Sequence, residues 1–468
     1  MPSEGEPRAV LVSGVLRTLI HFASAVPGVV WPPVPSSTTG AMLAMQYQFE
    51  RSEWLDRAEL GAFQLSQLRA LVRHAFQTVP YYQALQHSTG FPADSDFGFD
   101  EFQQLPVLTR RDIQDHYSRL VTTRLPAGHG RTIPSDTSGS GGSPLRFLTT
   151  DLAQFFFQAF SVRDHLWHRR DLSKKMLAIR VHPYPQTFSS WFPGVEPVPF
   201  VTGPLAVVPI HLPMVEQLDR IVAERPVYLL GHASHLIALT EEAIRTGRRI
   251  TGVDQVRTFA EMLPVEGRRL MEDYWGANVV DIYTTRECGY IGAQCPDSTV
   301  YHVQEGVIVE ILRRDGAPCQ PGETGRVVVT PLHNFAMPMI RYDLDDLAEA
   351  GPPCACGRGL PVLSRIAGRV RNMLRLPDGN SLWPMLGTYR DAIPAIRQRQ
   401  VVQRSLQELE LRLVVDRPLT ASEEVGAKAE LLARIGHPFQ IRLSYVDGFP
   451  RSGGGKFEEF RCEIAGVQ

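Results

Sequence analysis

The chain is poor in lysine relative to arginine. Of its 48 basic residues, only Lys174, Lys175, Lys428 and Lys456 are lysines, so the other 44 are arginines. Lysine carries a compact and mobile charge that the planar guanidinium group does not replace at every site. A genomic preference for arginine explains the composition, but each retained lysine is also a candidate for a site that needs a point charge.

Cysteine is scarce as well. Six cysteines in 468 residues are too few for a disulfide scaffold, which excludes the small secreted disulfide-rich classes. Four of the six lie close together in the sequence, namely Cys288, Cys295, Cys354 and Cys356. This clustering favours a metal site or a local core over secretion.

A clean membrane-spanning segment and an excess of positive charge are also missing. Residues Ala9 to Trp31 are mostly apolar, but Arg17, His21 and Pro27 interrupt them, whereas a spanning helix needs about 20 apolar residues. We expect a packed or surface-lying amphipathic helix here, and a cytoplasmic protein that is not an integral membrane protein. The net charge of -2 gives no broad reason to bind nucleic acid.

The pattern of apolar residues predicts an α/β fold in two domains. Leu65 to Ala75 and Phe155 to His168 have helical spacing, and Pro80 is expected to end the first pattern. From 176 onward, short apolar runs alternate with helical stretches such as His235 to Arg245, which indicates a parallel or mixed sheet. From Gly306 the runs become hairpin-like, which indicates a β-rich subdomain.

The last hundred residues predict a small α+β unit, with strands over 409–415 and 441–446 and a helix over 422–435. We place the domain joint near Gly368. The predicted domains are therefore a large N-terminal domain of residues 1–368 and a small C-terminal domain of residues 369–468.

Four segments carry candidate chemistry. The glycine- and serine-rich segment from Asp136 to Pro144 suits phosphate oxygens, because glycines let backbone amides approach an anion. The segment from Asp281 to Gly289 places an aromatic ring and an acid after an apolar strand. Asp346, which follows Met337 to Asp345, suits the two hydroxyls of a ribose. Taken singly, the first is equally well explained as a linker, and the other two are better explained as an ordinary strand end and a surface turn.

The fourth segment, Phe449 to Lys456, is a glycine-rich turn that ends in one of the four lysines. A solvated turn explains it as well as a catalytic one does. The order and separation of the four segments, however, resemble the adenylate-forming superfamily of acyl-CoA synthetases, adenylation domains and luciferases. The flanking segments 67–82 and 105–112 are similar to the phenylacetate–CoA ligase-like branch, which includes capsule-biosynthesis relatives.

This resemblance implies a ligase with a large N-terminal domain, a small mobile C-terminal lid, and ATP and Mg²⁺ as cofactors. A carboxylic acid, aromatic or otherwise small, would form an acyl-adenylate with release of pyrophosphate. The acyl group would then pass to CoA, or to an amine or hydroxyl acceptor. A catalytically impaired nucleotide-binding module is a further alternative, and a homodimer is possible in this family.

The resemblance also assigns the site residues. The β- and γ-phosphates would lie against the loop that comprises Thr137, Ser138, Gly139, Ser140, Gly141 and Gly142. Tyr283 and Thr284 would lie near adenine, beside the backbone of Ala260 and Glu261. Asp346 would bind the ribose hydroxyls, Arg369 the ribose or a phosphate, and Glu287 the Mg²⁺. Lys456 would bridge the incoming carboxylate and the α-phosphate.

Three positions depart from the family pattern. Leu145 and Arg146 stand where relatives often have a lysine after the loop. Arg286 replaces a hydroxyl residue that would touch the α-phosphate, so it is a candidate catalytic residue. Arg371 and Asn372 stand where many relatives have an acidic hinge, which makes the domain rotation and the CoA step uncertain from sequence alone.

The spacing of the cysteines fits a structural zinc site. Cys295 and His302 form a C-x6-H pair, and Cys354 and Cys356 form a C-x-C pair. Four such ligands suit tetrahedral Zn²⁺ without an open position, while buried thiols without metal are the alternative. We expect Cys288 to be a core residue and not a nucleophile. No short motif identifies the acyl pocket. The aromatics Phe156, Phe160, Trp167, Trp191 and Phe192 are candidates to line an aryl-acid site, but core packing is the favoured explanation for each.

Overall fold

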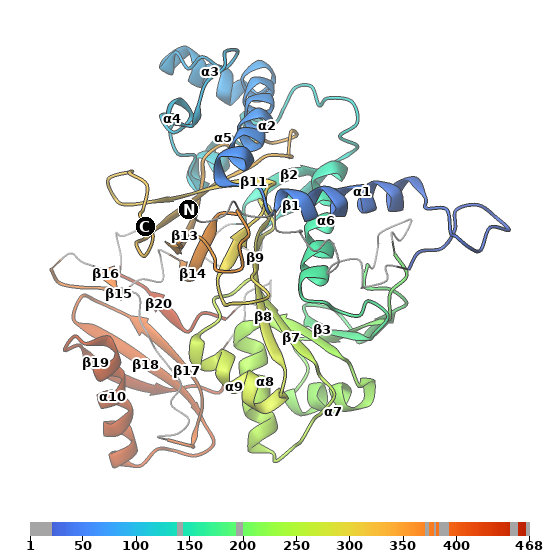
Figure 1. The fold of residues 1–468 in the computed structure, drawn as a ribbon. Helices are drawn as coiled ribbons and strands as arrows, with labels where there is room; N and C mark the ends of the chain where they lie inside the picture. Colours follow the sequence, from blue (N-terminus) through green and yellow to red (C-terminus); the bar gives the residue numbers. More distant parts are fainter. Residues whose placement is uncertain are drawn as a thin grey trace, which may run out of the picture.

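The N-terminal part of the molecule is helical (Figure 1). The computed structural model describes residues 21–137, 144–192, 200–369, 374–378, 381–382, 393–449 and 457–464. Its first helices are α1 (Ser37–Ser52), α2 (Arg57–Thr78), α3 (Pro80–Thr89), α4 (Phe99–Phe102) and α5 (Arg110–Leu120). α2 ends at Thr78, as expected for the pattern before Pro80, and Pro80 opens the next helix, α3, because proline is tolerated in the first turn, where its missing N–H has no partner to lose.

The apolar segment before α1 differs from the expectation. The sequence predicts an amphipathic helix over Ala9 to Trp31, but residues 21–31 form bends and turns, while residues before 21 lie outside the described part. Pro27 and Gly28 explain the difference, because Gly28 has a positive φ of 82° that interrupts a helix. Trp31 is 85 % exposed. Across the described residues, no helix has the length and apolar character required to cross a membrane.

A twelve-stranded mixed sheet forms the centre of the molecule. Its order is β11-β12-β13-β14-β10-β9-β8-β7-β6-β3-β5-β4. The strands are β3 (Met176–Arg180), β4 (Gln186–Phe188), β5 (Leu205–Pro209), β6 (Tyr228–His232), β7 (Gln255–Phe259), β8 (Asn278–Thr285), β9 (Gly289–Gln294), β10 (Tyr301–Val303), β11 (Val307–Leu312), β12 (Thr324–Pro331), β13 (Tyr342–Ala350) and β14 (Val362–Arg369).

Helices cover both faces of the parallel half of this sheet. Strands β5, β3, β6, β7 and β8 run parallel to one another, and they read as continuous buried runs because both faces are covered. One face packs on α7 (Met214–Glu224), α8 (Ala233–Arg245) and α9 (Val265–Trp275). The other face packs on α6 (Asp151–Trp167) and α1.

The antiparallel half begins at β9 and contains the predicted hairpin. β11 and β12 pair in register from Val307↔Pro331 to Leu312↔Arg326, as the apolar runs on either side of Asp315-Gly316 predict. A separate two-stranded hairpin, β1 (Thr132–Asp136) and β2 (Arg146–Thr150), precedes α6. These elements pack on α2 and α3 around a core that includes Leu68, Phe76 and Val329.

The C-terminal unit has its own sheet and its own core. Strands β17 (Ile396–Gln403), β18 (Glu408–Val415), β19 (Gln440–Tyr445) and β20 (Phe460–Cys462) are ordered β19-β18-β17-β20, and α10 (Ala421–Ile435) packs on them. A short pair, β15 (Leu374–Arg375) and β16 (Ser381–Leu382), precedes them. In Figure 1 this unit lies beside α8 and α9.

The predicted fold class is therefore confirmed: a large mixed-sheet α/β domain with a β-rich part is followed by a small α+β unit. The boundary between residues 368 and 369 stays a prediction. Gly368 lies inside β14, opposite Leu347 of β13, and Arg371 and Asn372 fall outside the described residues.

Candidate active site

The carboxyl ends of three parallel strands form the centre of the candidate site. His232 of β6 pairs with Phe259 of β7, and Phe259 pairs with Ile282 of β8. The residues that follow these positions, Ala260 and Tyr283 among them, therefore reach the same edge of the sheet. Ligands of open α/β sheets bind outside this edge. The topology thus brings together segments that are far apart in the sequence.

Tyr283 and Asp346 are joined by a buried hydrogen bond. The Tyr283 hydroxyl donates to Asp346 Oδ2 at 2.7 Å, and the two side chains are 7 % and 8 % exposed. Asp346 lies opposite Arg369 in the β13–β14 ladder, so the structure brings these three predicted positions together. Asp345, the preceding residue, has a positive φ of 58°, which sharply turns the strand at this point.

The base of the predicted phosphate loop is closed by Thr137 and Leu145. Thr137 N donates to Leu145 O at 2.9 Å, and Leu145 N donates to Thr137 Oγ1 at 2.9 Å. Ser138, Gly139, Ser140, Gly141 and Gly142 lie outside the described residues. Because β1 and β2 are antiparallel, the loop connects the two strands at one end of the hairpin.

Arg286 also contacts this loop base. Its Nη1 donates to the carbonyl oxygen of Asp136 at 2.6 Å. Arg286 lies in the turn of residues 286–288 between β8 and β9, with Glu287 next to it, and its side chain is exposed. Thr284 is in β8, opposite Tyr290 of β9. Arg286 is therefore hydrogen-bonded to the residue that precedes Thr137 at the base of the predicted loop.

Sequence reasoning missed Arg110, which donates from Nη2 to Thr137 Oγ1 at 3.4 Å. A signal for its position is present in the sequence, because Thr109 and Asp112 form a capping box that starts α5. The box sets Arg110 as the first helical residue, beside the β1–β2 hairpin. Two arginines, Arg110 and Arg286, therefore contact the Asp136–Thr137 end of the predicted loop.

Ala260 and Glu261 follow β7 (Gln255–Phe259). Ala260 has a positive φ of 65°, so the chain turns sharply after the strand. The Glu261 side chain contacts two distant backbone groups: Oε2 accepts from Ser234 N and Oε1 accepts from Phe457 N, each at 2.9 Å. Lys456, the residue before Phe457, lies outside the described residues.

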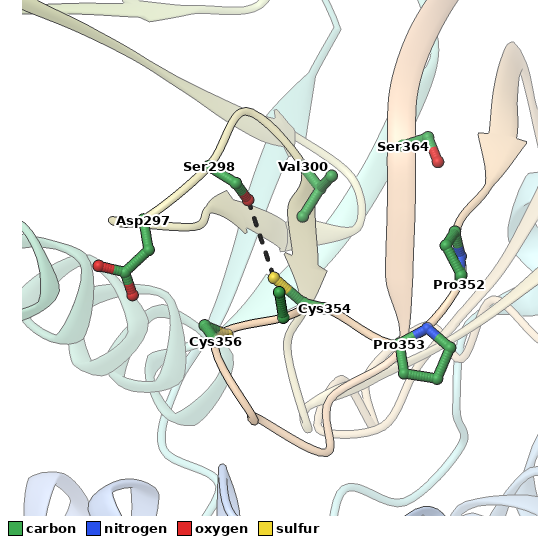
Figure 2. A pocket seen from close by; sticks show the side chains of 9 residues that line it. Asp297, Ser298, Val300, Pro352, Pro353, Cys354, Cys356 and Ser364 are labelled. Carbon is green, nitrogen blue, oxygen red and sulfur yellow. Dashed lines mark hydrogen bonds between the residues drawn. The ribbon is translucent and has the colours of Figure 1, made fainter.

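A second site, the candidate metal centre, lies apart from the strand edge. The ligand atoms of Cys295, His302, Cys354 and Cys356 all lie within 4.8 Å of one another. Cys354 Sγ is 3.8 Å from Cys295 Sγ, and Cys356 Sγ is 3.3 Å from His302 Nε2. Figure 2 shows Cys354, Cys356 and Ser298, whose Oγ is 3.8 Å from Cys354 Sγ. A hollow of about 520 Å³ opens beside them.

These distances fit zinc better than a disulfide. Two thiolates on one tetrahedral Zn²⁺, each about 2.3 Å from the metal, lie about 3.8 Å apart, whereas a disulfide requires about 2.05 Å. Burial, with Arg358 and Arg163 nearby, lowers the pKa of His302 to about 4, so its imidazole is neutral and able to ligate at neutral pH. Burial raises the pKa of Cys295 to about 11, so metal binding must displace its proton.

The loop that carries Cys354 and Cys356 is tied to the N-terminal helices. Gly359 N donates to Glu53 O at 2.9 Å, and Arg358 Nε donates to Glu53 Oε1 at 3.1 Å. The Arg358 guanidinium also lies over the rings of Trp54 and Trp167, at 4.9 and 4.6 Å from their centroids. The four ligand residues thus stand between the sheet and the end of α1, which suits a structural role.

Other sequence predictions concern the core. Cys288 is buried, and burial raises the pKa of its thiol, so it is a core residue, as expected. The aromatics Phe160, Trp167, Trp191 and Phe192 belong to one buried cluster, and Phe156 packs against it. Phe156 stacks on His333 with ring centroids 3.6 Å apart. These contacts are those of core packing.

The sequence comparisons find ligases. Residues 385–460 match the CapK C-terminal domain family. The chain is 25 % identical to a phenylacetate-coenzyme A ligase of Thermus thermophilus over 88 % of this chain and 98 % of the relative. It is 24 % identical to the Escherichia coli phenylacetate-coenzyme A ligase over 68 % of this chain and 72 % of the relative.

The structural comparisons agree on the fold. The 2-hydroxyisobutyryl-CoA ligase in its postadenylation state, in complex with 2-HIB-AMP, matches with a TM-score of 0.70 and 18 % identity, over 88 % of this chain and 91 % of that chain. The same ligase in its thioesterification state, with 2-HIB-AMP and CoA, matches with a TM-score of 0.58 over 88 % and 92 %. The comparisons confirm the resemblance seen in the sequence and the ligase class of enzyme.

Proposed function

On the premise that this chain is a homologue of the phenylacetate–coenzyme A ligases with an adenylate-forming fold, we propose that it activates a carboxylic acid with ATP and transfers the acyl group to CoA. In the first step, a carboxylate oxygen bonds to the α-phosphorus of ATP as the bond to pyrophosphate breaks. In the second, the CoA sulfur bonds to the acyl carbon and AMP leaves. The acid we propose is aromatic or otherwise small.

The observation that carries this proposal is the convergence of Tyr283, Asp346 and the loop base on one edge of the sheet. A buried carboxylate beside an aromatic ring offers the acceptors that two ribose hydroxyls need and a surface for a purine. The Asp136–Thr137 end of the loop lies within hydrogen-bond reach of Arg286, which follows Tyr283 by three residues. The adenosine and the triphosphate of ATP would therefore occupy one continuous site.

The chemistry of the first step is limited by charge, since an anion must approach a polyanion. Fixed cations lower that barrier by electrostatic stabilisation. We assign this role to Arg286 and Lys456, with Arg110 at the end of the loop. Glu287 is the proposed ligand of Mg²⁺, because carboxylate oxygen is a ligand that this ion prefers, and the bound ion neutralises phosphate charge.

We assign a structural role to zinc held by Cys295, His302, Cys354 and Cys356. Three thiols and one imidazole complete a tetrahedral set with no open position for a substrate or water. The contacts of Arg358 and Gly359 with Glu53 support a role in holding the N-terminal helices to the sheet.

The test of the proposed function is acid-dependent exchange of labelled pyrophosphate into ATP across a panel of aromatic and small aliphatic acids. Product analysis by mass spectrometry then follows, with CoA and, separately, with amines and alcohols. Exchange with at least one acid and a CoA thioester as product support the proposal. Amide or ester products without thioester would assign a different acceptor, and ATP binding without exchange for any acid would contradict the proposal.

A further inference from the structure

Glu261 links the large domain to the segment that follows the proposed catalytic lysine. Its Oε1 accepts from Phe457 N and its Oε2 accepts from Ser234 N, both at 2.9 Å. Phe457 directly follows Lys456 in the sequence and is 196 positions from Glu261. Two residues after Phe457, the carbonyl oxygen of Glu459 accepts a hydrogen bond from Val401 N of β17 at 2.8 Å. This bond attaches the segment that begins at Phe457 to the small sheet.

The chemistry of this link requires a carboxylate. Ser234 is in the first turn of α8 (Ala233–Arg245), where backbone N–H groups lack partners within the helix and a negative charge is stabilised. A carboxylate offers two acceptor oxygens and can serve Ser234 and Phe457 together, whereas a glutamine amide has one acceptor oxygen and serves only one of them. Glu261 thus fixes the Phe457 backbone to the start of α8.

The other end of α8 makes a second contact with the small domain. Arg397 of β17 donates to Glu242 Oε2 at 2.9 Å, and Glu242 also pairs with Arg245 at 2.6 Å. Glu242 is 5 % exposed and Arg397 is 39 % exposed. These two contacts therefore involve the same helix, the first through Glu261 at its first turn and the second directly near its last.

The placement of the two units agrees with one state of a solved relative more than with another. The match to 2-hydroxyisobutyryl-CoA ligase has a TM-score of 0.70 for its postadenylation state and 0.58 for its thioesterification state, at the same identity and the same coverage of this chain. The present arrangement is thus closer to that of the postadenylation structure.

We propose that α8 is the docking helix for the small domain, and that Glu261 is a positioning residue that seats the segment after Lys456 for the adenylation step. Glu261 acts through Phe457 and contributes no reacting atom. This inference rests on the proposed function and gives Glu261 a role other than the adenine contact expected from the sequence. The contacts of Glu261 and Glu242 would serve the first half-reaction and not the second.

The test compares Glu261→Gln and Glu261→Ala with the wild type in the two half-reactions. We expect the turnover number for acid-dependent pyrophosphate exchange to fall about 10-fold to 100-fold, as small misplacements of catalytic groups do, with the KM for ATP within about twofold of the wild type. Thioester formation from supplied acyl-adenylate and CoA is expected to stay unchanged. Arg397→Gln, which leaves the first turn of α8 intact, is expected to act in the same direction.

Glu59→Gln is the matched control, because Glu59 accepts the backbone N–H of Asp56 at the start of α2, a contact within the large domain. It is expected to leave both half-reactions unchanged. A rise in the KM for ATP with unchanged turnover would show that Glu261 binds the nucleotide and would overturn the positioning role. An equal loss in both half-reactions, or no loss in exchange, would also overturn it.

Hydrogen exchange separates a failure of this inference from a failure of the proposed function. In Glu261→Gln we expect residues 457–464 to exchange their amide hydrogens faster than in the wild type, while residues 233–245 remain protected by the helix. Unchanged exchange in 457–464 would contradict the link even in an active enzyme. If the wild type shows no pyrophosphate exchange with any acid, the proposed function fails, and the amide measurement still decides whether Glu261 seats this segment.

Discussion

The Tyr283 hydroxyl donates a 2.7 Å hydrogen bond to Asp346 Oδ2 across 63 positions of sequence. The bond orients the carboxylate that we assign to the ribose hydroxyls, and its donor comes from the ring that we assign to the purine. Both partners are buried, so the interaction is only weakly screened by solvent. Two proposed nucleotide contacts are thus part of one hydrogen-bonded unit.

Substitution of Asp346 should weaken ATP binding more than substitution of Tyr283. Asp346→Ala removes the acceptor itself, and hydrogen bonds to a charged group are each worth about 1.5–3 kcal/mol, so we expect the KM for ATP to rise about 10-fold to 100-fold. Tyr283→Phe keeps the ring and removes only the orienting bond, so its effect should be smaller. Steady-state exchange kinetics over a range of ATP concentrations measure both. An unchanged KM in Asp346→Ala would contradict the ribose assignment.

Arg286 is predicted to act on the phosphates and not only on the fold. Arg286→Ala removes a cation and the 2.6 Å bond to Asp136 O, and we expect the turnover number for exchange to fall at least about 10-fold. Arg286→Lys should recover part of the loss because the charge returns. The control is Arg111→Gln, an exposed arginine paired with Asp115 at 3.6 Å, which should be neutral. Equal rates for Arg286→Ala and wild type would refute the assignment.

If the four ligands hold zinc, we expect mass spectrometry of the purified protein to find about one zinc ion per chain. Cys354→Ser and Cys356→Ser should lower this content to near zero and lower the melting temperature, because each removes a ligand from a closed set. Cys319→Ser is the matched control, since Cys319 lies outside the cluster, and it should keep the zinc. Wild-type protein without bound zinc after preparation in zinc-containing medium would argue for plain buried thiols.

Asp281 gives a pH dependence of stability. Burial raises its pKa from 3.8 to about 6 in the folded protein, even though Thr258 and Tyr301 donate to it at 2.5 and 2.6 Å. The folded state therefore binds the proton more tightly, and this contribution to stability is present below pH 4 and is lost as the pH rises through 6. This difference in the pKa of Asp281 between the unfolded and folded states corresponds to about 3 kcal/mol.

We therefore expect Asp281→Asn, which has no such titration, to become more stable relative to wild type as the pH rises from 4 to 7, by up to about 3 kcal/mol. Urea unfolding at several pH values measures the difference in the free energy of unfolding between the two proteins. A difference that does not change with pH would show that Asp281 titrates as an ordinary exposed carboxylate.

Local patterns in the sequence predicted much of the fold. The hairpin of β11 and β12 and the helix α10 follow from apolar periodicity, because their stabilising contacts involve neighbours in the chain. The order of the sheet does not follow in this way: β14 pairs with β10, more than fifty residues earlier. A strand buried on both faces carries no mark of which strand lies beside it. The sequence therefore predicted a mixed sheet with a β-rich part but not the order of its strands.

In the candidate site, too, some features could be predicted from the sequence and others could not. The motifs predicted which segments meet, and the strand register explains why Ala260 and Tyr283 share an edge. The Glu261–Phe457 and Arg110–Thr137 contacts were not predictable, because a single side chain that bonds a distant backbone group leaves no periodic signal. The helix expected over Ala9 to Trp31 does not extend through residues 21–31, because the chain turns at Pro27 and Gly28, although both residues were visible in the sequence.

The most direct measurement of the central claim is acid-dependent exchange of pyrophosphate into ATP by wild-type and Lys456→Ala proteins, with the best acid of the panel at saturation. The account predicts exchange by the wild type and a loss of at least about 100-fold in the variant, with ATP binding retained. Full exchange in Lys456→Ala, or no exchange by the wild type with any acid, would contradict it.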